Sequence, residues 1–163
     1  MMLRIKNTDV WAAKLRNEPD TLALALQGLA DAGANLECVI TRRDNDNAER
    51  FTAFVTPIDG TEQKIRAPDL GFHPATGLYT LRVDGANRAG TGARITKAIS
   101  DAGITMHGMS ALTTGRRFVC YLGFDTEADR RKAANALNEL RFQHWPGWPH
   151  VAGSKIHDPA ITK

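Results

Sequence analysis

The sequence repeats a short pattern, and this repeat constrains the fold more than any other feature. Asp31–Gly33 recurs as Asp101–Gly103, and at the same spacing of about 70 residues Asn17 falls on Asn87. The repeat predicts a tandem duplication of one small unit. The expected division is a first repeat at 9–72, a second repeat at 77–141, and a tail rich in tryptophan and proline at 142–163.

Both repeats have the same predicted order of elements. Each begins with a strand, because apolar and polar residues alternate at 11–16 and 79–84. An amphipathic helix follows and ends at Gly33 or Gly103, since glycine adopts the left-handed closing conformation at little cost. A hairpin and a second helix come next, and Pro68 shortens that helix in the first repeat. This βαββα order predicts an α+β, ferredoxin-like unit, with antiparallel sheets that carry their helices on one face.

Two short motifs in each repeat resemble those of the ACT domain. The strand-to-helix breaks at 17–20 and 87–90 resemble its Asn-x-Pro-Gly break. Residues 32–36 and 102–106 resemble its Ala-Gly helix exit and the strand that follows. The resemblance covers roughly residues 9 to 141 and implies a ferredoxin-like βαββαβ unit repeated twice. Such a chain is similar to stand-alone tandem ACT regulators of the glycine-cleavage repressor family.

The resemblance also implies a function, because ACT domains bind amino acids or related metabolites, usually at an interface between two copies. It implies a non-catalytic, allosteric regulatory protein that binds an amino acid or another small metabolite and uses no cofactor. The implied partners are this small molecule, a second copy of the chain in a homodimer, and a regulated protein.

The loop before the helix of the second repeat suits a zwitterionic ligand. A helix N-terminus presents unpaired N–H groups and about half a positive charge, which attract a carboxylate. Gly90 and Gly92 leave the backbone accessible, although they also suit a plain turn, and the amide of Asn87 both donates and accepts. The predicted site comprises Asn87, Arg88, Ala89, Gly90, Thr91 and Gly92 in the loop, with Asn35 and Leu36 as a facing wall from the other repeat.

The equivalent loop of the first repeat is predicted to be a poorer site. Pro19 has no N–H, and the carboxylate of Asp20 can cap the helix and occupy the field that an external anion needs. Thr105 stands where the first repeat has Asn35, so we expect one site per chain. A weaker second site would comprise Asn17, Pro19, Thr105 and Met106.

The strand at 118–124 is apolar on both faces, which predicts burial on both sides of its sheet. Helices cover only one side of such a sheet. We therefore expect the other side to pack against the other repeat or against a second chain, and we expect a dimer.

Composition and motifs disfavour membrane proteins, metal-binding or redox proteins, and enzymes. No apolar stretch approaches the roughly 20 residues that cross a bilayer. The two cysteines, Cys38 and Cys120, form no redox or metal motif, and no two of the five histidines are spaced four apart on a helix. We expect no metal site, no catalytic activity and a cytoplasmic protein.

Two alternatives remain open. RNA-recognition modules share the βαββαβ order and stack bases on exposed aromatic residues, for which Phe51, Phe54, Phe118 and Tyr121 are candidates. The net charge of +3 is small for a nucleic-acid-binding protein and disfavours this alternative. The second alternative is a regulator that contacts a partner protein without any ligand. The stretch Trp145–Pro149 is either a packed coil or a stacking platform.

Overall fold

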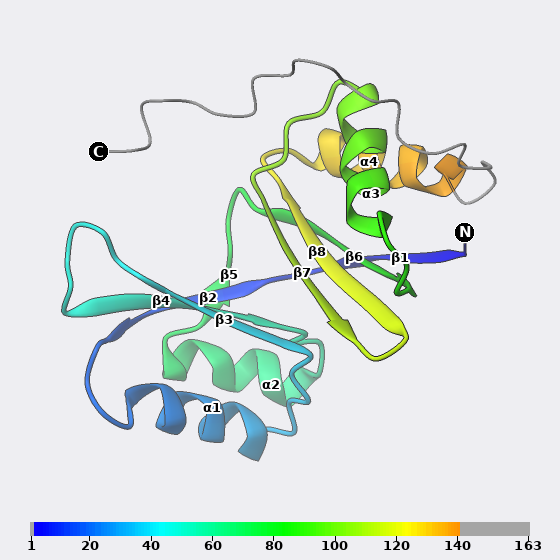
Figure 1. Cartoon of the computed structure of the whole chain (residues 1–163). Coiled ribbons are helices and arrows are strands. Elements are labelled where there is room, and N and C mark those ends of the chain that lie inside the picture. Colours follow the sequence, from blue (N-terminus) through cyan, green and yellow to red (C-terminus); the bar gives the residue numbers. More distant parts are fainter. Residues whose placement is uncertain (1, 141–163) are drawn as a thin grey trace.

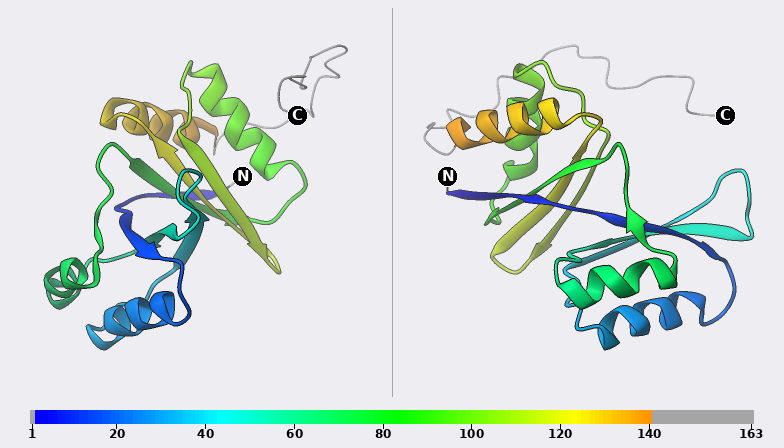
Figure 2. Two further views of the ribbon diagram at one scale, coloured as in Figure 1. Left: turned by 90° about the vertical axis from the view of Figure 1, so that its left-hand side faces the viewer. Right: turned by 180° about the vertical axis from the view of Figure 1, so that it is seen from behind.

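The computed structural model describes residues 2–140, which form two α+β units. Each unit is a four-stranded antiparallel sheet with its two α-helices packed on one face, as Figure 1 shows. The helices of the two units lie on opposite outer sides of the molecule, with both sheets between them (Figures 1 and 2). The predicted ferredoxin-like fold, present twice in one chain, is confirmed.

The first unit follows the βαββαβ order and ends with a very short strand. Its sheet has the strand order β3-β4-β2-β5. Helix α2 ends before Pro68, as predicted, and the chain continues there as a 3₁₀ turn. The elements are β2 (Trp11–Arg16), α1 (Thr21–Asp31), β3 (Cys38–Arg43), β4 (Arg50–Thr56), α2 (Thr61–Arg66), the 3₁₀ turn (Ala67–Leu70) and β5 (His73–Pro74).

The second unit is completed by a strand from the start of the chain. Its sheet has the order β1-β6-β8-β7, in which β1 takes the place beside β6 that β5 has beside β2. Nothing in the sequence pattern indicated this pairing, and the predicted division at 9–72 and 77–141 leaves β1 out. The first unit is therefore inserted between two parts of the second. The elements are β1 (Leu3–Thr8), β6 (Tyr79–Ala86), α3 (Thr91–Asp101), β7 (Gly108–Thr114), β8 (Arg117–Phe124) and α4 (Glu127–Leu140).

Each unit has its own apolar core between its sheet and its helices. In the second unit, alternate residues of β6 and β8 point inward and meet one face of α3 and α4. Leu3 of β1 is fully buried in this core, so β1 is part of the core together with the strands of the repeat. The largest fully buried side chains of this core are Leu3, Leu81, Val83, Ile95, Ile99, Leu122, Phe124 and Leu137. Those of the first unit are Leu29, Val55 and Phe72.

Helices α1 and α3 end in the same way. Gly33 and Gly103 have left-handed φ angles of 81° and 67°. The N–H of the residue after each glycine donates to the carbonyl five residues earlier, at 3.0 Å in α1 and 3.2 Å in α3. These bonds satisfy carbonyls that the helix itself leaves unpaired. The repeated Ala-Gly motif thus marks both helix ends, as predicted.

Two chain segments join the units and lie side by side. Asp9–Val10 leads from β1 to β2, and residues 75–78 lead from β5 to β6. The N–H of Ala75 donates to the carbonyl of Val10 at 2.9 Å, which links the two segments. The hydroxyl of Thr56 donates to the carbonyl of Asp9 at 2.8 Å and so ties the same region to β4.

The helix-free faces of the two sheets are turned toward each other. Cys120 and Leu122 of β8 point into the core of the second unit, so Tyr121 between them points to the other face. Phe54 has the corresponding position in β4, between the buried residues at 53 and 55. Both aromatic side chains line the space between the sheets. The second face of β8 thus packs against the other repeat, which is one of the two arrangements predicted.

Candidate functional site

Residues 87–92 form the predicted ligand loop, which comprises the connection between β6 and α3 and the first two residues of α3, and is called the α3 entrance below. Gly90 is the N-cap residue and has a left-handed φ of 81°, which glycine adopts without a steric penalty. A Cβ atom built at Gly90 or at Gly92 would meet nothing within 4 Å. The first turn of α3 contains no acidic residue. The backbone at the positive end of this helix is therefore open to an anionic group.

Asn87 has a structural role at this entrance. Its N–H donates to the carbonyl of Arg116 at 2.8 Å, and its side-chain Nδ2 donates to the carbonyl of Gly115 at 3.1 Å. Asn17 makes the same pair of bonds to the tip of the β3–β4 hairpin, at 2.6 and 3.2 Å. In each unit this asparagine anchors the end of the first strand to the hairpin tip. Its recurrence in the sequence therefore has a structural cause, and its predicted role in ligand binding stays a prediction.

The entrance of α1 differs from that of α3 at the N-cap. Asp20 occupies the position of Gly90 and has a positive φ of 63°. The prediction that its side chain caps α1 is wrong, because the structure shows no side-chain hydrogen bond from this residue to the helix. A capping side chain needs extended backbone at the N-cap, and a left-handed residue does not provide it. The carboxylate of Asp20 nevertheless remains at the positive end of α1.

The predicted wall residues have separate positions in the two units. Asn35 is exposed, and Leu36 packs against the core of the first unit. Thr105 is exposed, and Met106 packs against the core of the second unit. Within residues 2–140, none of the four forms a hydrogen bond or ion pair with either helix entrance. The structure thus assembles the loop residues, while the facing wall stays a prediction.

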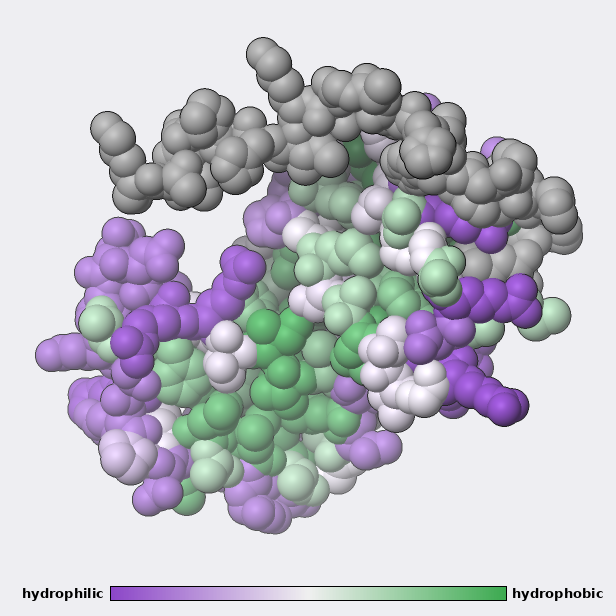
Figure 3. Space-filling model, viewed as in Figure 1, coloured by the Kyte–Doolittle hydropathy of each residue, from purple (hydrophilic) through white to green (hydrophobic). Residues whose placement is uncertain are grey.

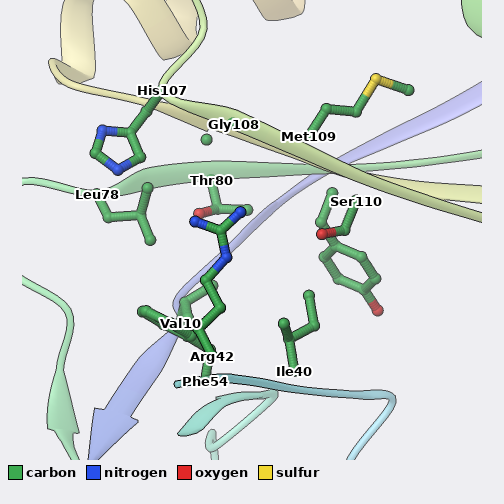
Figure 4. A pocket seen from close by; sticks show the side chains of 12 residues that line it. Val10, Ile40, Arg42, Phe54, Leu78, Thr80, His107, Gly108, Met109 and Ser110 are labelled. Atoms are coloured by element: carbon green, nitrogen blue, oxygen red, sulfur yellow. The ribbon is translucent and has the colours of Figure 1, made fainter. Parts of the chain in front are cut away.

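A cavity of about 190 Å³ lies between the helix-free faces of the two sheets and is called the inter-sheet cavity below. Its walls come from both units and are mainly apolar: Ile40 and Phe54 from the first unit, and Leu78 and Tyr121 from the second. Figure 4 shows these side chains around the opening, and Figure 3 shows apolar residues gathered where the units meet. This cavity was not predicted from the sequence. The available signal was a pair of glycines, Gly108 and Gly123, within strands, because glycine in a strand often marks a close approach or an opening.

Two ionisable groups near this cavity, the Tyr121 hydroxyl and the Cys38 thiol, are neutral at physiological pH. Burial raises the pKa of the Tyr121 hydroxyl, and the positive charge of Arg82, 6.0 Å from the Tyr121 ring, only partly opposes this rise. Burial also raises the pKa of the Cys38 thiol. Neither group therefore supplies a negative charge to the space between the sheets.

The sequence matches no known protein-family model and no curated protein, whereas the fold has relatives among solved structures. Protein BT0572 from Bacteroides thetaiotaomicron superposes with a TM-score of 0.69 and 16% identity, over 84% of this chain and 90% of that chain. The ligand-free regulatory subunit of aspartate kinase from Thermus thermophilus superposes with a TM-score of 0.57 and 16% identity, over 85% of this chain and 97% of that chain. E. coli aspartokinase III, solved with aspartate and ADP, superposes with a TM-score of 0.50 and 12% identity, over 83% of this chain and 33% of that chain. The chain has a tandem ACT-domain fold.

The structure removes the support for base stacking by the four candidate aromatic residues. Phe118 is 6% exposed and belongs to the core of the second unit, and Phe51 packs against the core of the first. Phe54 and Tyr121 face the inter-sheet cavity. The four candidate aromatic residues therefore form no open platform of the kind that RNA-recognition modules use.

The described part of the chain contains no candidate metal site and no candidate membrane-spanning helix. Residues 2–140 contain no group of three or more histidine, cysteine, aspartate or glutamate side chains that could hold a metal ion. No helix in this range is long and apolar enough to cross a membrane. The stretch Trp145–Pro149, for which a packed coil and a stacking platform were both considered, lies outside the described residues.

Proposed function

We propose that this tandem ACT protein is a non-catalytic regulatory protein that binds an amino acid or a related small metabolite at the α3 entrance. The observation that carries the proposal is the accessible backbone around Gly90 and Gly92 at the positive end of α3. A ligand carboxylate would accept hydrogen bonds from N–H groups of the first turn of α3 such as that of Gly92, since the N–H of Thr91 already donates to the carbonyl of Arg88 at 3.1 Å. The fold likeness to a regulatory subunit of aspartate kinase, and to an aspartokinase solved with aspartate, supports this choice of ligand class.

The two repeats are expected to differ in this activity. In the first repeat, Asp20 already places a carboxylate at the end of its helix, and Pro19 removes one N–H donor. In the second repeat, Gly90 leaves the equivalent position vacant. One strong site per chain follows, with Asn17, Pro19, Thr105 and Met106 at the weaker one.

A second copy of the chain would supply the wall opposite the α3 entrance. Within residues 2–140, β3 and β7 each form one edge of their sheet and pair on one side only, and β5 and β1 form the opposite edges. Such edges readily accept a further strand. We therefore expect a homodimer in which strand edges meet, with Asn35 and Leu36 of one copy facing the loop of the other. Ligand binding would then alter how the dimer contacts a regulated protein.

The test is a thermal-shift and calorimetric titration of the full chain with each of the twenty amino acids. A ligand at 100 times its Kd stabilises the folded state by about 2.7 kcal/mol, which for a chain of this size raises Tm by roughly 5–10 °C. Gly90→Asp should abolish the effect, because it places a carboxylate where the ligand carboxylate binds. Gly90→Asn is the matched control, since it has nearly the same shape, tolerates a positive φ and adds no charge.

The natural Asp20 shows that an aspartate fits this position of the fold with a φ of 63°. Loss of binding in Gly90→Asp is therefore not expected to reflect misfolding, and circular dichroism of the variant checks this. If Gly90→Asp and Gly90→Asn bind the amino acid equally well, the α3 entrance is not the site. If no amino acid binds at millimolar concentration, the ligand-free regulator becomes the better description.

A further inference from the structure

The inter-sheet cavity exists because one row of the second sheet lacks bulky side chains. Thr80 of β6 lies opposite Gly123 of β8, and Gly123 lies opposite Gly108 of β7. The three residues share the helix-free face, because their neighbours Leu81 and Leu122 point into the core. A Cβ atom built at Gly108 would meet nothing within 4 Å, whereas one built at Gly123 would meet the Leu78 side chain at 2.7 Å. The row therefore forms a shallow trough that Leu78 fills at Gly123 and that stays open at Gly108.

A buried hydroxyl in this trough has no partner in the part of the chain that the structure describes. Thr80 is 3% exposed and lines the cavity, and its Oγ1 forms no hydrogen bond with any described residue. A buried hydroxyl without a partner costs about 1–3 kcal/mol of stability, and most buried polar groups are paired. This hydroxyl is therefore suited to a bound molecule that supplies the missing acceptor or donor.

The cavity also contains an unpaired cation. Arg42 reaches in from β3 of the other unit and, within residues 2–140, forms no hydrogen bond or ion pair. Figure 4 shows its guanidinium group and the Thr80 hydroxyl directed into the same part of the cavity. The other basic lining residue, His107, is paired with Asp125 at 2.7 Å. Arg42 thus supplies the positive charge that is available to a ligand.

We propose that the inter-sheet cavity is a second binding site, separate from the α3 entrance, for a small monocarboxylate with an apolar body. The carboxylate would accept hydrogen bonds from Arg42 and from the hydroxyl of Thr80, since a guanidinium fits a carboxylate well. The apolar body would lie against Ile40, Phe54 and Leu78. A single free cation and apolar walls suit a carboxylate better than the more highly charged and strongly hydrated phosphate.

The volume of the cavity limits the size of the ligand, and its position between the two units indicates what binding would do. At about 190 Å³ the cavity is smaller than the 300–1,000 Å³ typical of drug-sized ligands, so a metabolite with one short branched or aromatic group fits. Arg42 belongs to the first unit and Thr80 to the second. One bound molecule would therefore bridge the two units and oppose their separation.

The test uses phenylacetate and 4-methylpentanoate as probes, with the neutral phenylacetamide as a matched control. Calorimetric titration of the full chain should show binding of at least one carboxylate and about tenfold weaker binding of the amide. Arg42→Gln should weaken carboxylate binding about tenfold or more, because a hydrogen bond to a charged group is lost. Arg43→Gln, one residue along the same exposed strand, should leave the affinity unchanged. Gly90→Asp should also leave it unchanged, which separates this site from the α3 entrance.

Thr80→Val gives a second and independent readout. It removes the hydroxyl but keeps the shape, so carboxylate affinity should fall several-fold while Tm without ligand stays equal or rises. A clear fall in Tm would show that the hydroxyl is already paired in the folded protein and would overturn the proposal. Absence of binding for both carboxylates at millimolar concentration would overturn it too, as would equal losses in Arg42→Gln and Arg43→Gln.

Discussion

The guanidinium group of Arg82 contacts acidic side chains of both units. Arg82 lies on β6, and its side chain is 14% exposed. Its Nε and Nη2 each donate to one carboxylate oxygen of Asp84 at 3.0 Å, and it forms an ion pair with Glu37 of the first unit. Arg82 thus neutralises a buried carboxylate in its own sheet and also holds the other unit in place. We predict that Arg82→Met strongly destabilises the protein.

The magnitude follows from what remains around Asp84. Its side chain is 8% exposed, so without Arg82 its charge is largely buried, and its remaining partner among the described residues is Arg117 at 3.8 Å. Removing one partner of a buried ion pair costs about 3–5 kcal/mol. Because Arg117 retains part of the compensation, we expect a loss of about 2–4 kcal/mol, which corresponds to a fall in Tm of about 4–16 °C.

Chemical and thermal denaturation of the full chain at neutral pH measures this loss. The double variant Arg82→Met/Asp84→Asn should recover at least half of it, because no buried charge is then left unpaired. Arg16→Met is the matched control, since Arg16 forms an exposed ion pair with Glu18 at 3.6 Å, and exposed pairs contribute less than about 1 kcal/mol. A loss below about 1 kcal/mol in Arg82→Met, or no recovery in the double variant, would refute the reasoning.

Three further predictions concern stability. Burial, together with the negative charge of Asp84, raises the pKa of Cys120 from 9.0 to about 12, so the folded state keeps a proton that the unfolded chain releases. Between these pH values the free energy of unfolding of the wild type should fall by about 1.4 kcal/mol per pH unit relative to that of Cys120→Val. Equal pH profiles of the two proteins in urea denaturation would contradict this prediction. Gly103→Ala should cost about 1–2 kcal/mol, because alanine is strained at a φ of 67°, and an unchanged denaturation midpoint would argue against the helix-end role. Leu122→Ala should cost about 2–5 kcal/mol by opening a cavity in the core of the second unit, and a smaller loss would indicate that the core collapses around the gap.

Local elements of the fold could be predicted because local sequence determines them. Gly33 and Gly103 mark helix ends since no other residue adopts the left-handed closing conformation as easily. The alternation at 79–84 predicted a strand with one buried face, and the structure buries that face but also Thr80 and Asp84 on the other face. Asn17 and Asn87 recur because each unit uses the same bond to its hairpin tip, although the sequence suggested a ligand role instead.

The pairing of β1 could not be predicted from the repeat. Leu3–Thr8 lies outside the duplicated pattern, and its partner strand is about 80 residues away in the sequence, with Leu3 opposite Gly85. Long-range pairing leaves no local signal beyond a short alternation of apolar and polar residues. The inter-sheet cavity escaped prediction for the same reason. Arg42 on one sheet and Thr80 on the other come together only when the two units pack.

The pair of Arg82 with Glu37 also bears on the inter-sheet cavity. Glu37 comes directly before β3, which carries Arg42, and Arg82 lies two residues after Thr80 on β6. The ion pair therefore holds together the two strands that supply the polar groups of the cavity. If it sets the spacing of the sheets, Arg82→Met should weaken phenylacetate binding even under conditions where the variant is fully folded. Glu37→Gln should weaken binding to a smaller extent without the large loss of stability, because Glu37 is 45% exposed and leaves no buried charge behind. Unchanged affinity in both folded variants would mean that apolar packing alone fixes the distance between the sheets.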